Sequence, residues 1–261
     1  MYCLLTDETN AEASAKAKFF IYGGLFFPLD KLPDLDRHVE TIRAKAGYKL
    51  GDSFKFDTNF RPKHVSIEAS TEAKKEVVQL CLDLGCRFIA LVILYRIIDQ
   101  SKPEDKYLWA ADHVIGRFNR FLADEGNDTG MVLIDTLPLK QQWQYLSDKF
   151  VNGLHLPSGN TVSLDRIRLY GSTCLNASYV ASAIDIVLGS FRYCVNDPSN
   201  RSTATEMLRG VARLMRHVRA GDRILLRDRG LIFRPEVVKV EAYRKEYDNL
   251  QEHLTALIRG K

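Results

Sequence analysis

The sequence lacks the signatures of several large protein classes. It has no G-x-S-x-G element, no phosphate-binding P-loop and no dinucleotide fingerprint, which argues against the hydrolases, NTPases and dehydrogenases that carry those motifs. It also has no internal repeat and no low-complexity tract. Any chemistry must therefore come from residues that are dispersed along the chain.

Signals for export, membrane insertion and zinc binding are missing as well. The first residues lack the basic start and apolar core of a signal peptide. The longest uncharged apolar run, Phe88 to Tyr95, is far shorter than the roughly 20 residues that span a bilayer. The 5 cysteines have no zinc-ligand spacing, which favours reduced thiols. We therefore expect a soluble, cytoplasmic protein.

What is present is the composition of a globular protein, with 46% hydrophobic and 27% charged residues in a chain of 261. Apolar runs predict strands at Tyr2–Thr6, Phe19–Phe27, Arg87–Ile98, Met131–Thr136 and Arg166–Tyr170, with a short strand-like segment at Ser53–Phe56. The remaining patterns predict helices at Asp30–Ala46, Thr71–Leu84, Lys106–Asp124, Pro138–Asn152, Asn176–Val195, Ala204–Ala220 and Val240–Ile258. This succession predicts an α/β fold, with one mixed sheet flanked by helices on both faces.

Charge divides the chain into two parts. Residues 201–261 carry 14 Lys and Arg against 8 Asp and Glu, whereas residues 1–200 have a net charge of −2. A polar linker begins at Asn196, so we expect a core at 1–195 and a basic, helical C-terminal extension at 196–261 that packs on it. The combination suits a phosphodiester substrate, although a solvated basic surface without a partner explains the charge equally well.

Acidic residues follow two of the predicted strands. Asp7 and Glu8 come directly after Tyr2–Thr6, and Asp135 follows the apolar run 131–134. Two core strands that each end in an Asp can hold both carboxylates at one rim of a sheet. Mg²⁺ and Mn²⁺ prefer such oxygen ligands. Acids are also common wherever a strand meets a turn, which is a sufficient explanation for either strand taken alone.

A third carboxylate, Asp185, lies in a segment that is apolar on nearly all sides of a helix and should therefore be buried. A buried Asp needs a cation, a basic partner or several hydrogen-bond donors, because an unpaired buried charge is costly. A salt bridge to Arg192 or Arg168 would serve, as would a metal ion. Together with Asp7 and Asp135, Asp185 predicts a site for one or two Mg²⁺ or Mn²⁺ ions.

Four segments also match the motifs of a known family. YCLLTDETN and FFIYGGLFF are similar to an opening pair of strands, the first ending in Asp-Glu-Ser-Gly and the second carrying paired glycines. SFKF is similar to a Glu-x-Lys element with Lys55 in the lysine position, and the strand ending at Asp135 matches an internal strand-end Asp. Ser172–Gly189 is similar to a closing helix with Gln-x-Ala-Asp. Over roughly residues 2–250 the chain resembles the domain-of-unknown-function family 3800.

Three positions depart from the family pattern. Thr9 and Asn10 replace Ser-Gly, and Ser53 replaces the Glu that precedes the lysine, with Asp52 beside it. In the closing helix Ser182 and Ile184 replace Gln and Ala, while Asp185 itself is retained.

The resemblance implies a ribonuclease H-like fold and a metal site. A two-metal site of this kind would make the protein a metal-dependent nuclease that acts on phosphodiester bonds. Asp7 would bridge two ions, Asp135 would hold one, and Asp185 would complete the cluster. Glu8 ranks fourth, because it points to the opposite face if the strand continues through it. Lys55 would contact the scissile phosphate, pair with the acids, or simply hold its segment to the core. The alternative function is a non-catalytic ribonuclease H-like binding or regulatory module, which the family resemblance associates with bacterial defence systems.

A basic stripe is predicted beyond the core. In the helix expected at Ala204–Ala220, Arg209, Arg213 and Arg216 recur at i, i+4 and i+7, and no acid lies between Arg209 and Arg219. We expect this stripe to guide nucleic acid towards the carboxylates, the alternative being an ordinary solvated face.

Overall fold

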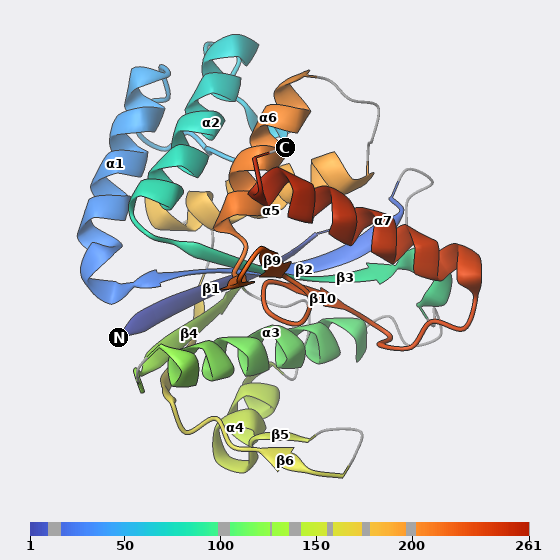
Figure 1. The fold of residues 1–261 in the computed structure, drawn as a ribbon. Helices are drawn as coiled ribbons and strands as arrows, with labels where there is room; N and C mark the ends of the chain where they lie inside the picture. The colour runs from blue at the N-terminus through green and yellow to red at the C-terminus, as the bar shows by residue number, and fades with distance from the viewer. Residues whose placement is uncertain are drawn as a thin grey trace.

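The computed structural model describes residues 1–9, 17–98, 105–125, 127–135, 142–155, 159–173, 178–196 and 202–260. Its centre is a six-stranded sheet with the strand order β10-β3-β2-β1-β4-β7 (Figure 1). The strands are β1 (Tyr2–Thr9), β2 (Phe19–Pro28), β3 (Arg87–Leu94), β4 (Gly130–Asp135), β7 (Ile167–Thr173) and β10 (Leu231–Phe233). β2 runs antiparallel to both β1 and β3, whereas β4 is parallel to β1, β7 to β4, and β10 to β3.

Helices cover both faces of this sheet. The layer above it in Figure 1 consists of α1 (Leu32–Lys45), α2 (Ile67–Asp83), α5 (Tyr179–Asn196), α6 (Ser202–Leu214) and α7 (Glu241–Ile258). The layer below it consists of α3 (Asp105–Asp124), α4 (Gln142–Asn152) and the hairpin of β5 (Leu154–His155) and β6 (Thr161–Val162). Short 3-10 turns lie at Leu29–Lys31, Thr58–Phe60 and Tyr95–Ile97, and a second hairpin joins β8 (Val218–Ala220) to β9 (Arg223–Leu225). The predicted fold class, a mixed sheet with helices on both faces, is confirmed. The C-terminal part is not wholly helical, because β8, β9 and β10 lie between α6 and α7.

The sheet separates two apolar cores. Side chains alternate along each strand, so Cys3 and Leu5 of β1 enter the upper core while Leu4 enters the lower one. β3 is buried on both sides, with Ala90 facing the upper helices and Leu91 facing α3. All five predicted strands belong to this one sheet, and the double burial of β3 is as its continuous apolar run predicted.

Local signals account for the helix ends that position the site. α2 begins after Ser66, whose Oγ accepts a hydrogen bond from Ala69 N at 3.0 Å. It ends before Gly85, which adopts a φ of +72°. The helix therefore starts four residues earlier than its apolar pattern predicted, since the capping serine lies outside that pattern.

Some predicted boundaries were wrong. Ser53–Phe56 forms no strand, because its backbone is committed to contacts with α5 and α2 that are described below. The helix predicted at 204–220 ends at Leu214, and the chain then returns through β8 and β9. β10 was not predicted at all, since three apolar residues are too short for a periodic pattern. Thr136, Pro138, Asn176 and the linker residues 197–201 lie outside the described ranges, and the division into a core and an extension stays a prediction.

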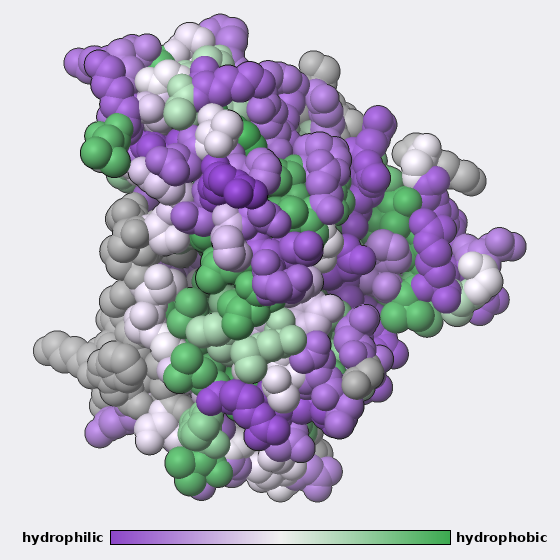
Figure 2. All heavy atoms as spheres, turned by 90° about the vertical axis from the view of Figure 1, so that its left-hand side faces the viewer, coloured by the Kyte–Doolittle hydropathy of each residue, from purple (hydrophilic) through white to green (hydrophobic). Residues whose placement is uncertain are grey.

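None of the helices in the described ranges combines the length and apolar character that crossing a membrane requires. Figure 2 shows the end of the molecule that lies at the left of Figure 1. Hydrophilic side chains dominate its upper and lower parts, and apolar side chains gather at mid-height, at the level of the sheet.

Candidate functional site

Two of the predicted acids lie on neighbouring parallel strands. β1 and β4 are paired up to the residues that immediately precede Asp7 and Asp135. Alternation places Asp7 on the face of Leu5, a residue of the upper core, and Asp135 on the face of Leu133, which packs against that core. Both acids are therefore directed towards the layer that contains α5.

The third acid reaches this region from α5. That helix is almost entirely apolar, and it packs on β1 and β2 through residues of the upper core such as Ile184 and Val187. Asp185 is only partly buried, and its Oδ2 accepts a hydrogen bond from the backbone N–H of Phe56 at 2.6 Å. The hydrogen-bond donor to Asp185 is therefore a backbone amide, and the positive charges of Lys55, Arg192 and Lys74 also act on its carboxylate.

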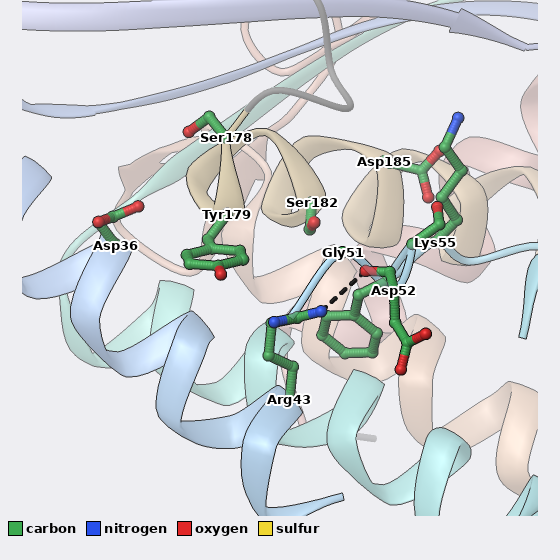
Figure 3. A pocket seen from close by; sticks show the side chains of 11 residues that line it. Asp36, Arg43, Gly51, Asp52, Lys55, Ser178, Tyr179, Ser182 and Asp185 are labelled. Carbon is green, nitrogen blue, oxygen red and sulfur yellow. Dashed lines mark hydrogen bonds between the residues drawn. The ribbon is translucent and has the colours of Figure 1, made fainter. Parts of the chain in front are cut away.

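A glycine allows the Phe56 segment to lie against α5. A Cβ at Gly189, one turn after Asp185, would lie 2.5 Å from the Cβ of Phe56, a distance that real side chains do not tolerate. On the other side of the segment, Nζ of Lys74 donates to the carbonyl oxygen of Phe56 at 2.9 Å. The segment is thus fixed between α5 and α2, and Lys55 is held next to Asp185 (Figure 3).

The pKa values connect the three acids. Burial raises the pKa of Asp7 well above its ordinary value, and the negative charges of Glu8, Asp185 and Asp135 raise it further. Burial also raises the pKa of Asp185, against the hydrogen bond from Phe56 and the positive charges around it. The charges of Asp135 and Asp185 therefore both reach Asp7, and this repulsion favours a bound cation. The convergence of all three carboxyl groups on one ion stays a prediction.

Glu8 faces the other side of the sheet. β1 continues through Thr9, which pairs with Ile21, so the pleat carries Glu8 away from Asp7. Its Oε2 is buried, and it finds no hydrogen-bond partner among the described residues. Burial first, and then the charge of Asp135, raise the pKa of Glu8 to about 7. The fourth rank given to Glu8 matches this position.

Lys74 is the residue that the sequence analysis missed. Its side chain is only 4% exposed, and burial lowers its pKa while the charge of Asp185 raises it. The helical pattern held the signal, because Lys74 falls on the same stripe as Ala73, Val77 and Val78, all of which are buried. Residue type alone predicts an outward-facing lysine, so Lys74 is absent from the predicted site residues.

Metal ligation itself is not established by these positions. Within the part of the chain that the structure describes, no three side chains among His, Cys, Asp and Glu stand close enough to form a ready-made metal site. The Mg²⁺ or Mn²⁺ site, and the catalytic roles of Asp7, Glu8, Lys55, Asp135 and Asp185, therefore stay predictions.

The predicted basic stripe needs a correction. Arg209 and Arg213 are exposed on α6, but Arg216 lies beyond the end of that helix and is only 5% exposed. Its guanidinium forms an ion pair with Asp124 of α3 at 2.5 Å and lies 5.3 Å from the ring centre of Phe121. A buried, paired arginine cannot belong to an exposed stripe, so at most two of the three arginines can meet a phosphate backbone there.

Comparison with known proteins adds little to this site. The sequence matches no family model and no curated protein. Among solved structures, the chain is similar to a crystal structure of a mutant protein of Bst-RNase HIII, with 11% sequence identity and a TM-score of 0.35. The similar region covers 81% of this chain and 61% of that one, so this chain matches less than two thirds of the length of that protein.

Proposed function

We propose that this protein is a divalent-metal-dependent nuclease that hydrolyses phosphodiester bonds of nucleic acid, and that it belongs with the ribonuclease H-like family that its motifs resemble. The observation that carries the proposal is the parallel pairing of β1 with β4, which sets Asp7 and Asp135 side by side on the face covered by α5, the helix that holds Asp185. Asp7, Asp135 and Asp185 come from two strands and a helix and face the same helical layer, and a cation between them would relieve their mutual repulsion.

The donor set fits Mg²⁺ or Mn²⁺. Asp7, Asp135 and Asp185 offer carboxylate oxygens, which hard divalent cations prefer. Glu8 also has a buried oxygen that lacks a partner among the described residues, but it faces the other side of the sheet. Asp7, Asp135 and Asp185 would hold one or two ions, with small side-chain adjustments on binding. Such ions activate a water molecule and stabilise the leaving oxygen of a phosphodiester.

The remaining residues position the site. Asp185 is oriented by the Phe56 amide, and Lys74 holds the carbonyl group of the same residue. These two hydrogen bonds fix Lys55 at the edge of the site, where its ammonium group can meet a phosphate oxygen. Arg209 and Arg213 remain available, on α6, to attract the strand over a longer range.

Manganese titration tests the proposal directly. A ligand that binds only the folded state raises the melting temperature, so Mn²⁺ should stabilise the wild type. Asp7→Asn, Asp135→Asn and Asp185→Asn should each reduce that rise and abolish cleavage of labelled RNA, DNA and hybrid substrates. Asparagine retains an acceptor for the Phe56 amide, so Asp185→Asn should still fold. Asp30→Asn, at a side chain that is 74% exposed and remote from the cluster, is the matched control.

The non-catalytic alternative makes the opposite prediction. If Mn²⁺ leaves the melting temperature of the wild type unchanged and no substrate is cleaved, the acids form no metal site and the chain acts as a binding or regulatory module.

A further inference from the structure

A cavity of about 540 Å³ opens beside Asp185 (Figure 3). Its walls are α1, the loop at residues 51–55 and the first turns of α5. Asp185 and Lys55 lie together at one end, and Tyr179 and Asp36 lie at the other. The volume is within the range of small-molecule pockets and suits a single nucleotide.

Arg43 supplies a buried positive charge in the wall of this cavity. Its side chain is 3% exposed, and its Nη2 donates to the carbonyl oxygens of Lys49 and Asp52 at 2.7 and 2.8 Å. No acidic side chain of the described residues forms an ion pair with it, and its buried Nε has no hydrogen-bond partner there. The charge of Arg43 reaches the carboxylate of Asp52, whose pKa it helps to lower, but no ion pair joins the two side chains. A buried guanidinium that lacks such a pair favours an anionic ligand.

The first turn of α5 offers a second attraction for an anion. Ser178, Tyr179 and Ser182 of this turn line the cavity, and helix N-termini present free backbone N–H groups and positive partial charge. The Oγ of Ser178 accepts the N–H of Val180 at 3.2 Å, and the start of a helix has further N–H groups without intrahelical acceptors. Both features lie within one cavity.

Tyr179 adds an aromatic surface. The guanidinium carbon of Arg43 lies 4.7 Å from the centre of its ring, and Tyr179 itself is only partly buried. A ring supported by a cation on one side is a suitable platform for a nucleobase. Three acids line the cavity. Asp52 accepts a hydrogen bond from Lys49 N and bonds His64, and Asp185, at the far end from Tyr179, accepts from Phe56 N. Asp36 lies at the Tyr179 end, where it can accept a hydrogen bond from a base or a ribose.

We propose that this cavity holds one unpaired nucleotide of the substrate, with its base on Tyr179 and its phosphate near Arg43 and the start of α5. The proposal rests on the nuclease function and names its substrate class as single-stranded nucleic acid. A base inside a duplex would have to leave its stack to enter so small a cavity, at an energetic cost.

Binding can be measured without metal. Calorimetric titration of the full chain in EDTA with adenosine 5′-monophosphate, adenosine and inorganic phosphate should rank the monophosphate as the tightest ligand. Tyr179→Ala should weaken binding of the monophosphate about tenfold, because a base–aromatic stack is lost. Tyr179→Phe keeps the ring and should bind as tightly as the wild type. Ser182→Phe should fill the cavity and block binding, which provides a second variant if Tyr179→Ala folds poorly.

Trp109→Ala is the matched control, because Trp109 is a partly exposed aromatic side chain on α3, in the opposite helical layer. Unchanged affinity in both Tyr179→Ala and Ser182→Phe, or a loss confined to Trp109→Ala, would overturn the proposal. So would equal cleavage of single-stranded and fully paired substrates by the wild type.

Failure of the cavity and failure of the nuclease function give different results. Asp7→Asn should lose cleavage but bind the monophosphate in EDTA as well as the wild type does. Binding without any cleavage by the wild type would refute the nuclease and retain a nucleotide site. Cleavage that depends on Asp7 but not on Tyr179 would refute the cavity alone.

Discussion

Glu8→Gln should stabilise the metal-free protein, by an amount that depends on pH. The pKa of Glu8 is raised from 4.5 to about 7, chiefly by burial. The folded state therefore holds more protons than the unfolded state between these values, and the stability of the wild type falls as the pH rises through that window. Gln has the same shape without the charge, so the variant escapes this loss.

The magnitude follows from linkage. One pKa unit corresponds to about 1.36 kcal/mol, so the change from 4.5 to about 7 costs the folded state about 3 kcal/mol at pH 8. Water reaches part of the carboxyl group, which reduces the expected gain of Glu8→Gln to about 2 kcal/mol. Below pH 4.5 the variant and the wild type should be equally stable with respect to this group.

Urea unfolding in EDTA at several pH values between 5 and 8 measures this difference. The free energy of unfolding of Glu8→Gln should exceed that of the wild type increasingly towards pH 8, with similar m-values. Glu252→Gln, at an exposed position on α7, is the control and should show no such trend. A constant difference across the pH range, or a variant less stable than the wild type at pH 8, would show that Glu8 is not a buried, repelled carboxyl group.

Three further predictions concern other buried charged or titratable groups. Lys74→Met should reduce cleavage strongly and lower the free energy of unfolding by about 1–3 kcal/mol, because the carbonyl of Phe56 loses its donor. Lys75 forms ion pairs on the surface, so Lys75→Met should change neither quantity in the same cleavage and urea assays. His113 accepts a hydrogen bond from Arg234 Nε, and burial together with the charge of Arg234 lowers the pKa of His113 from 6.5 to about 4. The free energy of unfolding should therefore fall as the pH drops from 6.5 towards 4, and His113→Gln should weaken this pH dependence. Arg216→Ala should destabilise the protein by about 1–2 kcal/mol, because Phe121 loses the guanidinium that covers its ring, while Asp124 keeps Arg229 as a partner. Thermal melts of Arg213→Ala should match the wild type.

Position along the chain was enough to predict the three central acids. Asp7 and Asp135 were identified because they end apolar strands, and Asp185 because it interrupts an apolar helix. Each of these patterns involves only residues that are neighbours in sequence, so it can be recognised without knowing the fold. Parallel pairing of β1 with β4 then brought the first two together, as two strand ends in one sheet should be.

The contacts that tune the site could not be predicted, because they join residues that are distant in sequence. The hydrogen bond between Phe56 and Asp185 spans 129 positions, and the one between Arg216 and Asp124 spans 92. Periodicity placed Arg216 on an exposed stripe only by extending a helix past its real end. Lys74 was assigned outward by residue type, although its spacing indicated the buried face.

The position of β10 has a consequence for how the chain acquires its structure during synthesis. This strand completes the sheet beside β3, yet more than a hundred residues separate Phe233 from its partner Val92. Until the ribosome has released that late segment, the outer edge of β3 is an open template for strands of other chains, and pairing across so long a separation is slow. A fragment that stops at residue 195 would keep this edge of β3 permanently uncovered. We therefore expect the fragment to self-associate even if Asp7, Asp135 and Asp185 were correctly placed.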